Sequence, residues 1–199
     1  DDMAATAARY GEARAIKIKL AGDAGDGERI AAVRAARPDV WLAVDANRSL
    51  TPASLHRLLA VLEAANVHLI EQPFAIGADA ALADLDLPIA LAADESIQTI
   101  ADLDRLAGFY QAVNIKLDKC GGLTDGLRLA QRARSLGLDV MVGNMLGSSL
   151  AMAPAFLLGQ FCSIVDLDGP IFLRADCAPG ATYRDGCIDC SPHPWGDGR

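Results

Sequence analysis

Residues 41–66, WLAVDANRSLTPASLHRLLAVLEAAN, contain one complete strand, turn and helix, and this unit indicates the class of fold. The apolar run Trp41–Asp45 ends in a carboxylate, as expected for a buried strand that reaches a polar edge. Thr51 and Pro52 then mark a helix start, and Asn66 marks its end. The apolar residues between them repeat at helical spacing and share one face: Leu55, Leu58, Leu59 and Leu62. The stretch therefore predicts a strand followed by an amphipathic helix.

The same unit recurs along the chain. Further β-branched runs predict strands over residues 15–20, 68–71, 89–94, 112–117, 139–143 and 163–168, with helical patterns between them. One such helix starts near Asp26, carries Ile30 and Val33 inward, and ends before Pro38. Strict alternation with short links predicts an α/β fold with a parallel sheet and right-handed crossovers.

Polar residues at the strand ends distinguish a closed barrel from an open sheet. Each predicted strand ends at or near one such residue, and their separations are 26, 26, 23, 25, 25 and 24 residues: Lys19, Asp45, Glu71, Asp94, Lys119, Asn144 and Asp168. An open doubly wound sheet builds its site from two or three strands at one switch point. A barrel brings every strand end to one mouth, so this pattern favours a TIM-like barrel.

Composition excludes several classes of function. The 199 residues carry a formal net charge of −8, which argues against nucleic acid and anionic membrane surfaces as partners. No apolar run is long enough to span a membrane, and no basic segment precedes an apolar one as in an export signal. The odd number of cysteines, five, then indicates reduced thiols in a cytoplasmic protein.

Three of the strand-end residues point to a metal. Asp45, Glu71 and Asp94 would repel one another in one mouth, and a hard divalent cation resolves that conflict. Oxygen ligands without His or Cys favour Mg²⁺ over zinc. Only four of the 18 basic residues are lysines, and they form two pairs that would lie on either side of the metal: Lys17 with Lys19, and Lys116 with Lys119. Lysine, unlike arginine, can serve as a proton-transferring base.

Five motifs together resemble the enolase superfamily, in its muconate-lactonizing subgroup. They are Lys17-Ile-Lys19, Asp45-Ala-Asn47, Glu71-Gln-Pro73, Asp94-Glu-Ser96 and Lys116-Leu-Asp-Lys119-Cys-Gly-Gly. Within the subgroup, Asp166-Leu-Asp168-Gly-Pro is similar to the aspartate pair of dipeptide epimerases, the L-Ala-D/L-Glu epimerase group. The resemblance covers nearly the whole chain and implies a Mg²⁺-dependent epimerase that acts on a dipeptide through an enediolate.

The resemblance also implies a role for each site residue. Lys19 and Lys119 would be the two acid/base residues, and Asp45, Glu71 and Asp94 the Mg²⁺ ligands. Lys17 would lie beside the substrate carboxylate and hold down the pKa of Lys19. Asp166 and Asp168 would receive the free α-ammonium of the dipeptide. The substrate-binding set implied in this way is Lys17, Asn47, Lys116, Asn144, Met145, Asp166 and Asp168.

The family pattern sets the expected domain organisation. Residues 1–176 would form strands 2–8 of a (β/α)7β barrel that lacks its first strand and the N-terminal capping domain. Residues 177–199 would be a tail that packs on the capping domain. With two open sheet edges, we expect these 199 residues alone to be inactive and prone to associate. The full-length form is expected to be a homo-oligomer.

Three other functions are compatible with the same residues. An o-succinylbenzoate synthase or muconate cycloisomerase would share the metal and lysines, but its substrate carries no ammonium for Asp166 and Asp168. The substrate of an N-acyl amino acid racemase would also carry no ammonium. A truncated barrel that only binds metal or a partner is the alternative of a different class. Turnover on a panel of dipeptides separates these possibilities.

Overall fold

Parallel strands alternate with helices in this computed structural model, which describes residues 2–190. The chain divides into two units, and each is described by itself. The first runs up to Ser96 and includes Gly108–Tyr110, and the second contains Ile97–Ala107 and the chain from Gln111 onward. Of the predicted tail, residues 177–190 lie in the second unit, and residues 191–199 lie outside the described part.

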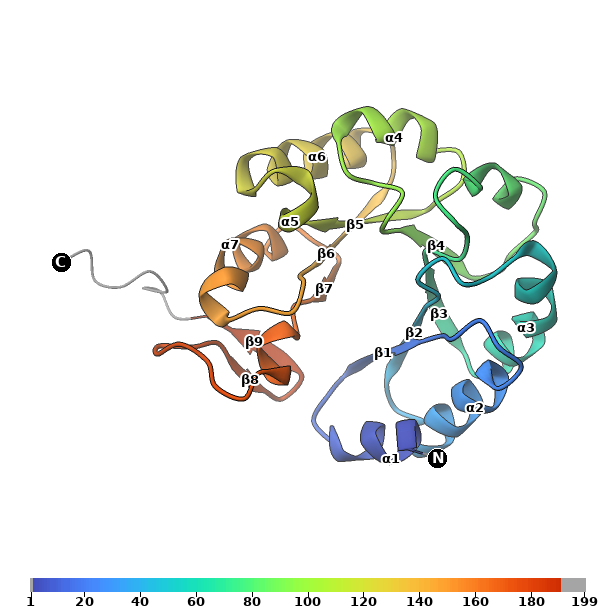
Figure 1. Cartoon of the computed structure of the whole chain (residues 1–199), viewed down its shortest axis with the longest axis horizontal. Helices are drawn as coiled ribbons and strands as arrows, with labels where there is room; N and C mark the ends of the chain where they lie inside the picture. Colours follow the sequence, from blue (N-terminus) through green and yellow to red (C-terminus); the bar gives the residue numbers. More distant parts are fainter. Residues whose placement is uncertain (1, 191–199) are drawn as a thin grey trace. The chain divides into compact units, whose positions relative to one another are not determined.

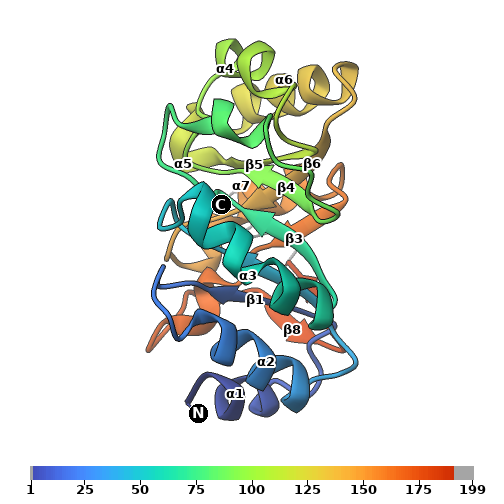
Figure 2. The same cartoon turned by 90° about the vertical axis from the view of Figure 1, so that its right-hand side faces the viewer.

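The first unit holds four parallel strands in the order β1-β2-β3-β4. Their bounds are β1 (Ala15–Lys19), β2 (Trp41–Asp45), β3 (Val67–Glu71) and β4 (Ala90–Ala93). The helices are α1 (Asp2–Arg9), α2 (Asp26–Ala36), α3 (Pro52–Ala64) and the 3-10 turn η1 (Asp79–Leu82). The three α-helices lie side by side along one face of these strands (Figures 1 and 2).

The second unit holds three further parallel strands, in the order β5-β6-β7. These are β5 (Ala112–Lys116), β6 (Asp139–Gly143) and β7 (Ile164–Asp166). Its helices are α4 (Ile100–Leu106), α5 (Leu117–Cys120), α6 (Leu123–Ser135), α7 (Ser149–Gly159) and the 3-10 turn η2 (Gly169–Phe172). Helix α6 packs on β5 and β6, and an antiparallel hairpin follows: β8 (Thr182–Arg184) and β9 (Cys187–Asp189).

The start of α3 follows from its sequence. The Thr51 hydroxyl accepts a hydrogen bond from the Ser54 amide at 3.2 Å, and the Ser54 hydroxyl in turn accepts from the Thr51 amide at 2.8 Å. This reciprocal cap satisfies two of the amides that a helix start leaves unpaired, and Pro52 has no amide to satisfy. Asn66, just past the helix, adopts φ +48°. The predicted start and stop are confirmed, and Leu55 and Leu62 are fully buried.

Some elements were not anticipated from the sequence. They are helix α1 and the β8–β9 hairpin. Four predicted strands run one or two residues too far: 15–20 ends at Lys19, 89–94 at Ala93, 112–117 at Lys116 and 163–168 at Asp166. After the last two strands the chain takes a helical path, in α5 and η2. Within residues 2–190, no helix combines the length and the apolar character that crossing a membrane requires.

Arg37, at the end of α2, ties the segment before β1 to the first unit. It is only 6% exposed, and its guanidinium donates to the carbonyls of Tyr10 and Ala13 and to both carboxylate oxygens of Asp39. These hydrogen bonds from a charged group hold the turn between α1 and β1. The hydrogen bonds from Arg37 to the Asp39 carboxylate also lower the pKa of Asp39 to about 2.

Replacing Arg37 with methionine should lower the free energy of unfolding by about 2–3 kcal/mol, because the carbonyls of Tyr10 and Ala13 lose a charged donor. Denaturant unfolding of this variant and of Arg57→Met, an exposed arginine on α3, provides the comparison. Equal stability of the two variants would show that Arg37 does not hold the turn.

The ion pair of Arg37 with Asp39 also makes stability depend on pH. Asp39 contributes stability above its unfolded pKa, near 3.8, and this contribution is lost as the pH falls toward about 2.

Candidate functional site

The strand ends of the first unit bring six predicted site residues together: Lys17, Lys19, Asp45, Asn47, Glu71 and Asp94. Lys19 is in register with Asp45, and Asp45 is in register with Glu71. Glu71 is in register with Ala92, so Asp94 follows two residues later, just past the end of β4. Backbone hydrogen bonds continue past the strands, from Leu20 to Asp45 and from Ala46 to Glu71. The positions of these side chains are therefore set by the sheet itself.

Three carboxylates are buried at this edge. Asp45 and Glu71 are fully buried, and Asp94 is 2% exposed. Burial raises the pKa of Glu71 to about 7; the Lys17 ammonium opposes this rise, while the charges of Asp45 and Asp94 add to it. The positive charge around Glu71 is therefore too small to keep its carboxylate fully ionised at neutral pH.

Both lysines of the first pair contact these carboxylates. The Lys17 Nζ donates to Glu71 Oε2 at 2.8 Å and lies 3.8 Å from Asp45 Oδ2. The Lys19 Nζ donates to Asp45 Oδ2 and to Asn47 Oδ1, each at 2.9 Å. The Lys17 side chain is 17% exposed and that of Lys19 is 66% exposed. Lys19 thus reaches into solvent from the same edge, where it can meet a ligand.

The turn after β2 holds Asn47 in place. Asn47 has φ +41° and Arg48 has φ +69°, a left-handed conformation that asparagine tolerates better than most residues. The backbone amide of Asn47 donates to Asp45 Oδ1 at 2.9 Å. Arg48 forms an ion pair with Glu95 at 3.0 Å. The turn therefore folds Asn47 back over the carboxylate of Asp45.

The carboxylates fit a divalent cation by their chemistry. Three buried oxygen donors without imidazole or thiolate suit Mg²⁺. As the side chains stand in residues 2–190, no three His, Cys, Asp or Glu groups form a ready-made metal cluster. Instead, the ammonium groups of Lys17 and Lys19 serve as the cations beside Asp45 and Glu71.

A buried aspartate that the sequence analysis did not assign to the site supports the loop after Lys19. Asp26 is fully buried, and its carboxylate accepts from the amides of Ala21 and Gly22 at 2.9 and 2.8 Å. Arg29 also donates to it, at 2.6 Å. The sequence showed Asp26 only as a helix start, because an N-terminal acidic residue is common in helices.

In the second unit, a row of residues crosses β5, β6 and β7. Lys116 is in register with Gly143, and Gly143 is in register with Asp166. A Cβ on Gly143 would lie 2.9 Å from Asn114 Oδ1 and 3.0 Å from Lys116 Cε. Glycine at the end of β6 therefore leaves room for these two side chains to lie over the strand. Asn114 is fully buried, and the sequence analysis did not single it out.

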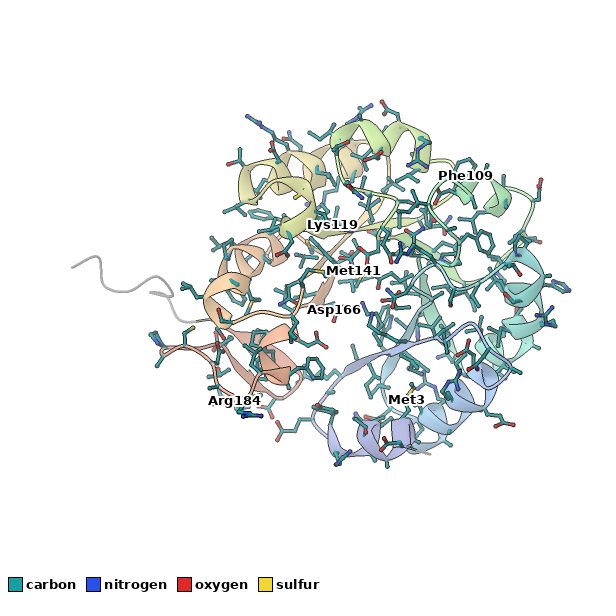
Figure 3. All side chains as sticks on the ribbon, in the orientation of Figure 1. Met3, Phe109, Lys119, Met141, Asp166 and Arg184 are labelled. Atoms are coloured by element: carbon teal, nitrogen blue, oxygen red, sulfur yellow. The ribbon has the colours of Figure 1, made fainter. Side chains whose placement is uncertain are left out.

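Lys119 lies on the short helix α5, and Figure 3 labels it together with Asp166 of β7. Its Nζ lies 3.5 Å from the carbonyl oxygen of Asn114, at the limit of a hydrogen bond. Gly121 and Gly122 end this helix at φ +94° and +104°, a conformation that only glycine adopts easily. The motif Lys119-Cys-Gly-Gly thus encodes a one-turn helix that carries the lysine just beyond β5.

Asn144 and Met145 follow β6 directly. Both polar atoms of the Asn144 amide are buried without a hydrogen-bond partner in the described part of the chain. Met145 is 55% exposed. Asn144 also lines a cavity of about 370 Å³, together with residues of α5, α6 and α7 such as Leu117 and Pro154. An unpaired buried amide is costly, so a polar group of a ligand would stabilise it.

The two aspartates after β7 differ in their surroundings. Asp166 is half-buried at the end of the strand, whereas Asp168 is exposed and lies beyond it in a helical conformation. The predicted strand alternation therefore does not extend to Asp168. Asp168 is the N-cap of η2 by position, yet its side chain makes no capping hydrogen bond.

The comparisons with known proteins agree with this arrangement. Residues 2–194 match a family model described as enolase C-terminal domain-like. The chain is 48% identical over 158 residues to the N-acetyl-D-glutamate racemase of a Pseudoalteromonas species, which covers 79% of this chain and 50% of that protein. It is 41% identical over 188 residues to the L-Ala-D/L-Glu epimerase of Escherichia coli strain K12, with 94% and 58% covered.

A solved structure shows the same fold. The dipeptide epimerase of Cytophaga hutchinsonii, complexed with Mg and the dipeptide D-Ala-L-Val, superposes with a TM-score of 0.87 at 28% identity. The match covers 94% of this chain and 54% of that one. The expected fold class, an α/β barrel domain, is confirmed. The chain spans about half the length of the curated relatives it matches.

Proposed function

Because this chain belongs to the enolase C-terminal domain-like family, we propose that the protein epimerises a dipeptide at the α-carbon of its C-terminal residue. One observation carries the proposal: three buried carboxylates and two lysines meet at neighbouring strand ends of the first unit. The similarity to an L-Ala-D/L-Glu epimerase over 94% of the chain supports it.

Asp45, Glu71 and Asp94 would hold Mg²⁺. When bound, the ion would offset the second negative charge that develops on the substrate carboxylate as the α-proton leaves. The solved dipeptide epimerase complexed with Mg supports this choice of ion. The raised pKa of Glu71 points the same way, because a nearby cation would favour its ionised form.

The lysines would move the proton. An α-hydrogen beside a carboxylate is very weakly acidic, so its removal needs a positioned base as well as electrostatic stabilisation. In the proposed mechanism, either Lys19 or Lys119 removes the proton and the other returns one to the opposite face. Asn47, which accepts from Lys19, would orient that ammonium. Lys17, on Glu71, would lie beside the substrate carboxylate.

The remaining predicted residues would bind the rest of the dipeptide. Asp166 and Asp168 would accept hydrogen bonds from the free α-ammonium, since Asp166 ends β7 and Asp168 is exposed two residues further on. Asn144 would contribute its buried amide, and Lys116 and Met145 would lie beside it. The dipeptide complex of the Cytophaga hutchinsonii enzyme supports a substrate of this class.

A second candidate function is racemisation of an N-acetyl amino acid. It is favoured by the identity of 48% to an N-acetyl-D-glutamate racemase, over 79% of the chain. Such a substrate carries an amide in place of the ammonium. The two candidates share the metal and the lysines and differ only in the group that meets Asp166 and Asp168.

Acetylation of the dipeptide's amino group tests between them. It removes the positive charge and leaves the reacting α-carbon unchanged. A hydrogen bond to a charged group contributes about 1.5–3 kcal/mol, so we expect kcat/KM to fall about tenfold or more. Asp168→Asn should show a similar loss on the free dipeptide and little further loss on the acetylated one. Equal turnover of both substrates would favour the N-acyl amino acid racemase.

A further inference from the structure

Gln72, the residue after Glu71, lies in a strained but tightly held conformation. It is fully buried and has φ +35°, which is unusual for a residue other than glycine. Its backbone amide donates to the backbone carbonyl of Ala92 at 2.8 Å, and its backbone carbonyl accepts from the backbone amide of Arg48 at 2.9 Å. Such conformations persist where the surroundings over-determine them, often at functional sites.

The Gln72 side chain forms hydrogen bonds with the segment that carries the Asp94 carboxylate. Its Oε1 accepts from the backbone amide of Asp94 at 2.9 Å and from that of Ser96 at 3.0 Å. These two amides bracket the turn Asp94-Glu-Ser96 at the end of β4. One side chain that follows Glu71 therefore fixes the backbone from which the Asp94 carboxylate projects.

A buried network fixes which end of the Gln72 amide faces Asp94. Its Nε2 donates to the carbonyl of Phe74 at 3.0 Å and the Ser96 hydroxyl at 2.9 Å, with the Tyr110 hydroxyl at 3.4 Å. Both hydroxyls donate to Asp79 Oδ1 at 2.7 Å. Because their protons go to Asp79, the two oxygens can only accept from Gln72. A flipped amide would place an oxygen against three acceptors.

We propose that Gln72 is a positioning residue that holds the Asp94 carboxylate in place for metal binding, and that Asp79 and Tyr110 lock its orientation. The inference rests on the proposed function, since it requires a metal at Asp45, Glu71 and Asp94. Replacing a residue that hydrogen-bonds to a metal-binding residue typically weakens metal affinity about 10–100-fold. A network that only satisfied buried polar groups would affect stability and leave the affinity of the folded protein unchanged.

Calorimetric titration with Mn²⁺ tests this role in the full chain, because it reports binding by the folded protein without any turnover. Gln72→Met keeps the length of the side chain and removes both its donor and its acceptor. We expect it to weaken Mn²⁺ binding about 10–100-fold. Tyr110→Phe removes one hydroxyl and keeps the buried ring, and it should weaken binding about two- to tenfold.

Two controls separate positioning from stability and from the proposed function. Leu55→Ala creates a cavity under α3 and should lower the melting temperature while leaving Mn²⁺ affinity within twofold of the parent. Asp94→Asn removes the proposed ligand itself. If the parent protein binds Mn²⁺ and both Gln72→Met and Tyr110→Phe bind it equally well, the positioning role is wrong and the metal site stands. If neither the parent nor Asp94→Asn binds Mn²⁺, the metal site fails, and the positioning role fails with it.

Discussion

Lys119→Ala is expected to abolish epimerisation, with a loss of about 10²–10⁴-fold in kcat, because a positioned acid or base typically contributes this much. The sharper result concerns hydrogen exchange. If each lysine serves one face of the α-carbon, the variant retains a base for only one epimer of the substrate. That epimer should exchange its α-hydrogen with deuterium from solvent and keep its configuration. The measurement is NMR of both epimers of the dipeptide in D₂O.

Lys19→Ala is the matched counterpart and should exchange the other epimer only. Arg128→Ala, an exposed cation on α6 paired with Asp125, controls for loss of positive charge in the second unit and should epimerise at the parent rate. The assignment of two bases fails if both lysine variants exchange the same epimer, or if either one still interconverts the epimers at the parent rate. It would also fail if the full-length form, with Mg²⁺, neither exchanges nor interconverts any dipeptide.

Glu71→Gln is expected to abolish both Mg²⁺ binding and turnover, because it removes a charged ligand while keeping the shape of the side chain. A metal ion that polarises a substrate contributes several kcal/mol, so we expect activity to fall about 10³-fold. Mg²⁺ should raise the melting temperature of the parent by mass action, by about 2.7 kcal/mol in stability at 100 times its dissociation constant. The variant should show no such rise.

The stability of the metal-free protein gives this variant a second, independent signature. Burial raises the pKa of Glu71 in the folded state to about 7, from a usual value of 4.5. The folded state thus binds more protons in this window, so this group makes stability fall as the pH rises from about 4.5 to about 7. Without metal, Glu71→Gln should lack that decrease, whereas Glu63→Gln, an exposed carboxylate on α3, should keep it. An unchanged melting-temperature response to Mg²⁺ in Glu71→Gln would contradict the ligand assignment.

Local patterns in the sequence predicted most of the architecture. The strands of both units lie within a residue or two of their expected ends, because apolar runs and helix caps act over a few neighbouring residues. The cap at Thr51 and the stop at Asn66 are examples. The expectation that Asp45, Glu71 and Asp94 lie together also followed from sequence, because the ends of neighbouring parallel strands meet at one edge of the sheet.

Errors arose where a strand gives way to a helix. The apolar pattern of residues 112–117 continues past Lys116, yet the backbone turns into α5 there, and Gly121 and Gly122 close the turn. Lys119 is therefore carried by a helix and not by a strand. At the end of β7, Asp168 takes a helical conformation for the same reason, because Gly169 and Pro170 begin η2. A period-two rule cannot show where a strand stops when the next residue is apolar, as Leu117 and Leu167 are.

Local sequence patterns were enough to predict the alternation of strands and helices and the polar residue at or near the end of each strand, since both depend on residues a few positions apart. Which buried polar groups support these residues is visible only in the folded chain. Gln72 reaches Asp94 through a positive φ, and Tyr110 meets Asp79 across 31 residues of chain. Such contacts depend on a backbone twist and on packing between distant segments, and neither has a periodic signal. The physical reason is that a hydrogen bond is specified by distance and angle in space, which only the folded chain defines.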